Sequence, residues 1–440
     1  MMATNEQATL KRTLGPLMLW GLGVGYVISG MYFGWNLGLP LGGTLGMAIA
    51  TFFIIILYVT FTFSYTELAC AIPKAGGAFD YAYRALGPRW GFMAGMAQNV
   101  EFIFAPPAIA FAIGAYFHTS FPDIPVKVVA ISAYLIFTLL NISGVRAAAI
   151  FELLVTILAV AELLLFAGIT LPHVELSNVV STSLPNGISG IFAALPFAIW
   201  FFLGIEGVAN VAEETVNPQR NVVLGFGSAI ATLVVLCLLT FVSAVGVSGW
   251  EGIVYPEPGA MASDSPLPLA LKKVLGERHV FYHLLITVGL FGLIASFHGL
   301  LLAAGRSMYE FAKVGYAPAM LGKVNAKTKT PAIALTFNML LGIIAILTGK
   351  TAEIITIAVF GALCLYAISM YSLMVLRRRE PQLERPFQVP LYPFFPIIAL
   401  TISIVSLLAM VYYNPLLSMI YIAILVFSYG YYRLTKGNKV

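Results

Sequence analysis

Three acidic side chains stand inside long apolar stretches of the 440-residue sequence. Glu101 begins the segment EFIFAPP, Glu162 lies in the apolar stretch 147–171, and Glu206 lies in WFFLGIEG. An ionisable group at membrane depth is costly, so a functional role is its default interpretation. Such a carboxyl group can hold an ammonium group or carry a coupling proton, and the alternative for each is a structural contact with a neighbouring helix.

Glycine and proline interrupt two of the apolar stretches. The first, GLGVGYVISGMYFGWNLG at 21–38, has Ser29 near its centre, and the second has Pro196, Gly204 and Gly207 around Glu206. Irregular backbone at membrane depth is tolerated only where protein or a water-filled cavity surrounds it. The interrupted stretches are the first and the sixth, and inverted-repeat transporters place broken helices at such matching positions. This pattern predicts a binding site between the two breaks, although glycines also serve close helix packing.

The composition requires a membrane to bury these stretches. Hydrophobic residues make up 60% of the chain and charged residues 10%, against ~45–50% and ~25% in soluble domains. A helix needs about 20 mostly apolar residues to cross a bilayer. The apolar runs predict twelve transmembrane helices, near 17–39, 43–71, 88–117, 126–142, 147–171, 188–211, 222–248, 281–311, 332–349, 352–376, 391–412 and 415–434.

The distribution of basic residues predicts an orientation. With a cytoplasmic N-terminus, most of the 24 Lys and Arg residues fall in cytoplasmic segments. The loops on the other side then hold Lys127, Lys272, Lys273, Arg278 and Lys350. The positive-inside rule therefore predicts that both termini are cytoplasmic. Because the basic residues are spread over short loops, the net charge of +5 does not indicate nucleic-acid binding.

The sequence gives little support for disulfides, metal sites or enzyme active sites. Cys70, Cys237 and Cys364 form no CxxC pair, which argues against disulfides or a zinc site. The sequence has no HExxH, GxSxG or nucleotide-binding loop, so we expect neither an enzyme nor a cofactor or metal. The segment 249–280 forms the longest external connection. It is either an outer lid or a solvated loop with one surface helix.

Three motifs resemble the amino acid/polyamine/organocation (APC) superfamily over nearly the whole chain. They are ELACAIPKAGGAFDYAYRALGPRWGFMAG at 67–95, GIEGVANVAEETVNPQR at 204–220 and GRSMYEFAKVGYAPAMLGKVNAKTKTP at 305–331. The resemblance implies an all-α membrane protein with a LeuT-like 5+5 inverted repeat and two extra helices. In that fold 1–440 is one transporter domain, with a cytoplasmic N-terminus at 1–16, repeats at 17–171 and 188–376, and the last two helices at 391–434.

Two shorter stretches resemble the bacterial ethanolamine permeases. They are YFGWNLG at 32–38 and EFIFAPPAIAFAIG at 101–114, while Met31 departs from the more polar residue of that branch. The resemblance implies a permease of the cell inner membrane that imports ethanolamine or a similar small ammonium alcohol by alternating access, coupled to protons. The alternative is an amino acid permease of the same superfamily, in which the broken first helix holds a carboxylate.

The resemblance also implies the positions of the site. The substrate-binding candidates on the first, third and sixth helices are Ile28, Ser29, Gly30, Met31, Glu101, Phe102, Ala105, Trp200, Phe201, Gly204 and Glu206. Trp200 would offer an aromatic face to a cation, or serve only packing. The candidates for coupling or gating are Glu162, Glu206, Ser296 and His298. Ser296 could instead help to form a sodium site, and His298 could be an ordinary core histidine.

Overall fold

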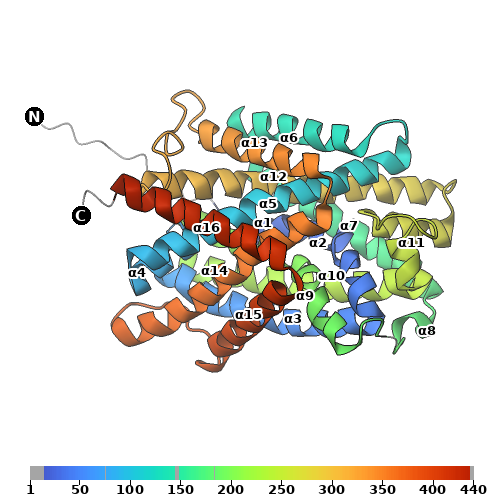
Figure 1. The fold of residues 1–440 in the computed structure, drawn as a ribbon, viewed down its shortest axis with the longest axis horizontal. Coiled ribbons are helices and arrows are strands. Elements are labelled where there is room, and N and C mark those ends of the chain that lie inside the picture. Colours follow the sequence, from blue (N-terminus) through green and yellow to red (C-terminus); the bar gives the residue numbers. More distant parts are fainter. Residues whose placement is uncertain (1–13, 75, 144–147, 183, 437–440) are drawn as a thin grey trace, which may run out of the picture.

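The computed structural model describes residues 14–74, 76–143, 148–182 and 184–436, and its regular elements are all helical (Figure 1). The order begins with α1 (Pro16–Val27), α2 (Ser29–Tyr32), η1 (Trp35–Gly38), α3 (Leu39–Ala71), α4 (Ala78–Leu86), α5 (Pro88–Ser120), α6 (Val126–Ser143) and α7 (Ala148–Thr170). It continues with η2 (Leu171–His173), α8 (Leu176–Val179), α9 (Gly187–Trp200), η3 (Ile205–Glu214), α10 (Pro218–Val254), α11 (Pro266–Leu275), α12 (Val280–Lys313), α13 (Ala332–Thr348), α14 (Thr351–Arg379), α15 (Phe394–Tyr413) and α16 (Pro415–Lys436). Most of the predicted N-terminal segment, 1–13, lies outside the described residues.

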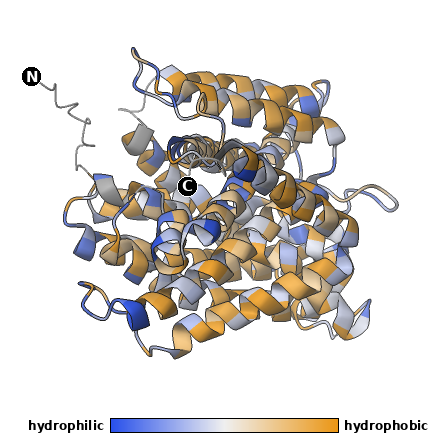
Figure 2. Cartoon of the chain, turned by 60° about the vertical axis from the view of Figure 1, so that its left-hand side comes forward, coloured by the Kyte–Doolittle hydropathy of each residue, from blue (hydrophilic) through white to orange (hydrophobic). Residues whose placement is uncertain are grey.

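The described helices make this a multi-pass membrane protein. Ten helical segments are long and apolar enough to cross a bilayer, and two shorter apolar segments, Pro16–Tyr32 and Ala332–Thr348, lie at the predicted first and ninth spans. Apolar residues dominate the outer helices in Figure 2. The number of twelve crossings and the inverted repeat remain predictions, because ten of the segments have the length of a span.

The helix with Glu101 is the most enclosed of the candidate spans. In its most apolar window 83% of α5 is buried, against 17% of α16, so α5 lies inside the bundle and α16 at its edge. Glycine permits the tight contact between α5 and α14. A Cβ added to Gly361 would lie 2.5 Å from the carbonyl oxygen of Ala97. The backbone of α14 therefore lies directly against the turn of α5 that leads to Glu101.

Both predicted helix breaks are confirmed. The first helix stops at Val27, resumes for one turn at Ser29, and continues as η1 only after Gly34. The sixth span ends its α-helix at Trp200 and resumes as η3 at Ile205. Between them Gly204 adopts φ +99°, which residues with a Cβ rarely accept. The two interruptions leave backbone groups that other parts of the protein must satisfy.

Two short helices accompany the membrane spans. The amphipathic helix α4, which sequence analysis did not predict, lies between Gly77 and Gly87, both with positive φ. Its apolar side packs on α5 and α14. The segment after α10 contains α11, in agreement with the surface helix considered for the external connection. Helix α10 runs beyond its predicted end because it continues past a kink at Gly249.

A buried ion pair ties together the ends of α3 and α14. Glu67 is fully buried, and the Arg377 guanidinium donates to both of its oxygens, at 2.8 and 2.6 Å. The Val389 amide donates to the same carboxylate at 2.7 Å, and Arg385 lies 3.4 Å away. A buried carboxylate needs this many partners to offset its loss of water. Glu67 thus holds the segment between α14 and α15 against the bundle.

Candidate substrate site

The two broken helices meet at a backbone contact. A Cβ added to Gly30 would lie 2.4 Å from the carbonyl oxygen of Trp200 and 3.0 Å from the Cα of Phe201. No side chain larger than hydrogen fits there without movement. Gly30 therefore lets the interrupted part of α1 and α2 lie directly on the end of α9.

Ser296 of α12 holds the first break from the other side. Its hydroxyl oxygen accepts a hydrogen bond from the Ser29 amide at 3.0 Å and donates one to the Gly25 carbonyl at 2.6 Å. The Met31 amide donates to the Ile28 carbonyl at 3.0 Å. One side chain thus satisfies an amide and a carbonyl on the two sides of the break, as buried backbone groups require.

Glu101 and Glu206 come together in the centre of the bundle. Their carboxyl groups lie within hydrogen-bonding reach of each other, and their exposed fractions are 0% and 1%. The Tyr366 hydroxyl donates to one oxygen of Glu206 at 2.9 Å. Among the described residues, neither oxygen of Glu101 and only that one oxygen of Glu206 accepts a hydrogen bond. Apart from a proton that the two groups can share, three buried carboxyl oxygens are therefore left without a donor.

Two tyrosines that sequence analysis missed complete this cluster. Tyr58 of α3 and Tyr366 of α14 have their hydroxyl oxygens 3.0 Å apart, and Tyr58 also reaches the Ile199 carbonyl at 3.4 Å. They connect Glu206 to the end of α9. Nothing in their local sequence separates them from aromatic residues that only fill apolar helices, so only the packing identifies them.

Aromatic rings surround the α9 break. Trp35 stacks on Phe201 with ring centroids 5.4 Å apart, and Phe33 meets Trp200 edge-on at 5.4 Å. The Trp200 indole nitrogen is buried and has no hydrogen-bond acceptor among the described residues. Phe102 is also buried and faces Gly207 of η3.

The remaining substrate candidate on α5 is Ala105. It is buried one turn beyond Glu101, on the same side of the helix. The structure thus gathers the substrate-site candidates around the two breaks and the middle of α5.

The coupling candidates lie in separate contacts. Glu162 accepts a hydrogen bond from the Tyr32 hydroxyl at 2.7 Å, which holds α2 against α7. His298 lies 3.5 Å from the carboxylate of Glu152, a buried residue that sequence analysis did not single out. Ser296 belongs to the first break.

The external connection covers one end of α2 and η1. The Asn36 side chain donates to the Ser263 carbonyl at 2.8 Å, and the Thr351 hydroxyl donates to the Asp264 carboxylate at 2.9 Å. We call residues 255–265 the outer strap. It joins the first broken helix to the start of α14, so it can act as a lid over this end of the site.

The strap should close more firmly in acid. Burial raises the pKa of the Asp264 carboxyl to about 6, against the opposing hydrogen bond from Thr351. The closed strap therefore binds the Asp264 proton more tightly than an open, solvated strap does. The free energy that this proton contributes to closure is lost as pH rises through about 6. We expect hydrogen exchange of the strap, corrected for intrinsic rates, to be faster at about pH 7.5 than at about pH 5. Asp264→Asn should abolish the difference and Glu257→Gln should retain it, whereas equal corrected rates in the unmodified protein would contradict this role.

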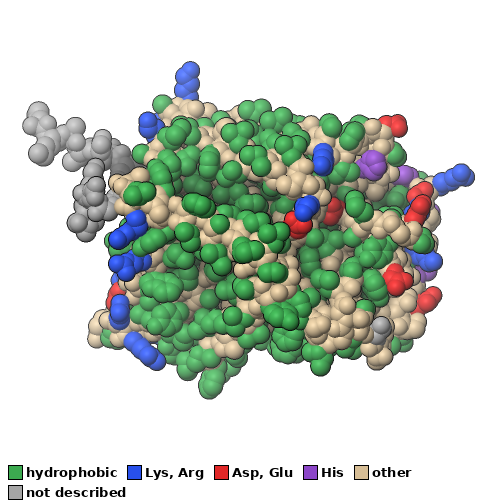
Figure 3. All heavy atoms as spheres, viewed as in Figure 1, with side chains coloured by type: hydrophobic (Ala, Val, Ile, Leu, Met, Phe, Trp, Pro, Cys, Tyr) green, Lys and Arg blue, Asp and Glu red, His purple; other side chains and the backbone are tan. Residues whose placement is uncertain are grey.

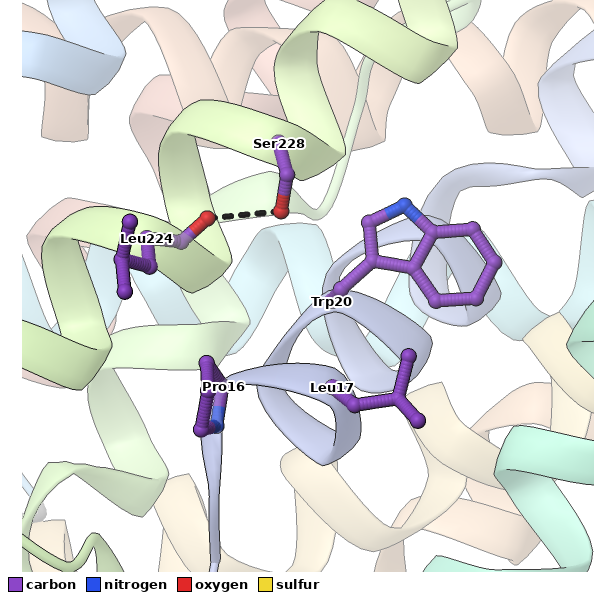
Figure 4. A pocket seen from close by; sticks show the side chains of 5 residues that line it. All are labelled: Pro16, Leu17, Trp20, Leu224 and Ser228. Atoms are coloured by element: carbon purple, nitrogen blue, oxygen red, sulfur yellow. Dashed lines mark hydrogen bonds between the residues drawn. The ribbon is translucent and has the colours of Figure 1, made fainter.

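A groove between α1 and α10 lies apart from the carboxyl pair. Figure 4 shows its lining residues, Pro16, Leu17, Trp20, Leu224 and Ser228. Its walls are mostly apolar, and Leu17 and Leu224 are exposed on the outside of the bundle. The groove therefore opens on the outside of the bundle, and its lining residues include no charged group with which to bind an ionic substrate.

Comparison with known proteins identifies the family. The family model described as "Amino acid permease" matches residues 14–428. The chain belongs to the amino acid permease family. This permease is 27% identical to an uncharacterized transporter of Rhizobium meliloti (strain 1021) over 410 residues, which cover 90% of the chain and 86% of that protein.

Two relatives from Bacillus subtilis (strain 168) have named substrates. The permease is 27% identical to the branched-chain amino acid permease BcaP over 424 residues, covering 90% of the chain and 88% of the relative. It is 26% identical to a methylthioribose transporter over 428 residues, with the same coverage. These relatives are transporters, not enzymes, and their names span different chemical classes of substrate.

Proposed function

We propose that this permease imports ethanolamine or a similar small ammonium alcohol across the cytoplasmic membrane, by alternating access and coupled to protons. The proposal includes the LeuT-like inverted repeat, twelve membrane crossings and cytoplasmic termini. On the face in Figure 3, most basic side chains lie at the end of the molecule near α4, and acidic and histidine side chains lie mainly toward the opposite end, together with a few basic ones. That separation supports the orientation given by the positive-inside rule.

The observation that carries the substrate proposal is the buried Glu101–Glu206 pair. Two carboxylates in contact, shut off from water, repel each other unless a proton or a cation lies between them. Apart from a proton shared within the pair, three of their oxygens have no donor among the described residues, and a primary ammonium group has three N–H donors. The charge and the number of hydrogen bonds therefore both favour a small primary amine.

The hydroxyl group of such a substrate needs one polar partner. The Trp200 indole N–H is a buried donor without an acceptor among the described residues, on the broken helix that leads to Glu206. A substrate hydroxyl oxygen could accept this hydrogen bond, and the ring offers an apolar or cation–π surface to the rest of the molecule.

Two of the amides at the first break already have acceptors, which leaves fewer of them for a substrate carboxylate. An amino acid needs free amides at the break to hold its carboxylate. Here the Ser29 amide already donates to Ser296, and the Met31 amide donates to Ile28. The amino acid alternative keeps the support of relatives named for amino acids, such as BcaP. The methylthioribose transporter is a relative whose named substrate is not an amino acid.

Competition during transport tests the substrate proposal. We expect proteoliposomes with the purified permease to take up labelled ethanolamine, and unlabelled ethanolamine to compete strongly. Choline should compete poorly because its quaternary nitrogen carries no N–H donor for the carboxyl pair. Putrescine, alanine and arginine are tested as competitors in the same assay. Labelled alanine uptake that ethanolamine does not inhibit would refute the proposal and favour an amino acid permease.

A further inference from the structure

The pair formed by Glu152 and His298 is a second buried ionisable site, separate from Glu101 and Glu206. The His298 Nδ1 lies 3.5 Å from one carboxylate oxygen of Glu152, and the exposed fractions are 4% and 2%. The other carboxylate oxygen has no hydrogen-bond donor among the described residues. A buried, incompletely satisfied carboxylate is expensive, so a structural role alone accounts poorly for it.

The pair lies directly against the first broken helix. A Cβ added to Gly25 would lie 2.7 Å from the unpaired oxygen of Glu152 and 2.7 Å from the Thr156 hydroxyl. The Thr156 hydroxyl donates to the Gly21 carbonyl at 3.2 Å. The Gly25 carbonyl also accepts the hydrogen bond from Ser296 of α12. The same glycine of α1 thus contacts both the carboxylate on α7 and the serine that holds the substrate-site break.

Few other ionisable groups face this carboxylate. His298 comes from α12 and Tyr26 from α1, with the ion pair Arg306–Glu214 beyond Tyr26. The other elements packed on α7 are α10, α11 and η2, and none of their side chains is among the groups that interact with the Glu152 carboxyl. His173 of η2 is 21 residues further along the chain, about 30 Å along α7 at 1.5 Å per residue. Helix α10 carries Arg220 and Glu251 near its ends and the Cys237 thiol between them, and α11 carries Lys272 and Lys273 in its last turn.

We propose that the Glu152–His298 pair binds the coupling proton and that this proton controls how α1 docks. With one proton fewer the pair has a net charge of −1, and with the proton it is neutral. When α1 is packed against α7, the contact with Gly25 excludes water, and burial without water costs the neutral pair less free energy than the charged pair. When α1 moves away, water reaches the carboxylate, stabilises its charge and favours release of the proton. Since α1 also forms half of the substrate-site break, proton release and substrate release become linked.

This proposal deepens the proposed import function and rests on it, so the experiment has two readouts. Proteoliposomes with the wild-type protein, Glu152→Gln and Glu162→Gln are compared for counterflow of labelled ethanolamine without a pH gradient, and for accumulation driven by an alkaline interior. Glu162→Gln tests the competing coupling candidate on the same helix, because Glu162 is also buried and accepts a hydrogen bond from Tyr32 instead of pairing with a histidine.

We expect Glu152→Gln to lower gradient-driven accumulation by roughly tenfold or more, a size typical of coupling between sites. Counterflow should persist, because exchange needs no net proton movement, and it also shows that the variant is folded. His298→Gln should shift the pH at which accumulation is half-maximal. Accumulation that survives in Glu152→Gln but is lost in Glu162→Gln would overturn the assignment.

The wild-type protein separates the two proposals. Wild-type protein that shows ethanolamine counterflow but no accumulation driven by the pH gradient would overturn the proton site and leave the substrate proposal intact. The absence of any ethanolamine counterflow would instead overturn the substrate proposal. The proton-site proposal, which rests on it, would then fall as well.

Discussion

Glu101→Gln should abolish ethanolamine binding and leave the folded protein intact. Gln keeps the shape of the side chain but removes the charge and replaces one acceptor oxygen by an NH2 donor. Removing one partner of a buried charge pair costs about 2–5 kcal/mol, so affinity should fall by roughly 30-fold or more. Calorimetric titration of the purified variant with ethanolamine measures the loss.

The control for this variant is Glu353→Gln. Glu353 is a half-exposed residue in a surface ion pair with Lys350, so the same chemical change there should leave binding unaltered. The unliganded Glu101→Gln protein should melt no earlier than the wild type, because the change relieves the repulsion between two buried carboxylates. Full ethanolamine affinity in Glu101→Gln would show that Glu101 does not bind the ammonium group.

Gly30→Ala should abolish transport by separating the two broken helices. The added methyl group would lie 2.4 Å from the Trp200 carbonyl oxygen, and the atoms it meets are backbone, which cannot rotate away. Overpacking of this kind costs about 1–3 kcal/mol. We expect a lower melting temperature together with ethanolamine uptake close to background in proteoliposomes.

Gly227→Ala provides the matched comparison. No atom lies within 4 Å of a Cβ at Gly227 of α10, so the same substitution should leave uptake unchanged. Alanine is also the better helix former, by about 1 kcal/mol. Normal uptake by Gly30→Ala would mean that the contact between the breaks is not needed for the transport cycle.

The positions of the breaks were predictable because their cause is local. Glycines and a buried carboxylate within an apolar stretch cannot form an ordinary lipid-facing helix. The structure interrupts its helices at Ile28 and at 201–204, within the two stretches that carry these signals. Helix α4 was missed because its nine residues are too few for a span and its apolar side is visible only at helical spacing.

The contacts of the candidate site were less predictable. Glu101 and Glu206 were each identified as candidates, but their meeting depends on how α5 lies against η3. Tyr366 is 160 residues from Glu206, so no sequence spacing relates them. Glu152 shares an apolar stretch with Glu162, and its histidine partner is 146 residues away. Tertiary packing alone distinguishes the two carboxylates.

Ligand-induced thermal stabilisation of the purified permease tests the central claim most directly. A ligand that binds only the folded protein stabilises it by about 2.7 kcal/mol at 100 times its Kd. We predict that ethanolamine raises the melting temperature in a concentration-dependent way and that alanine and arginine do not. A shift with alanine or arginine and none with ethanolamine would contradict the ammonium site between Glu101 and Glu206.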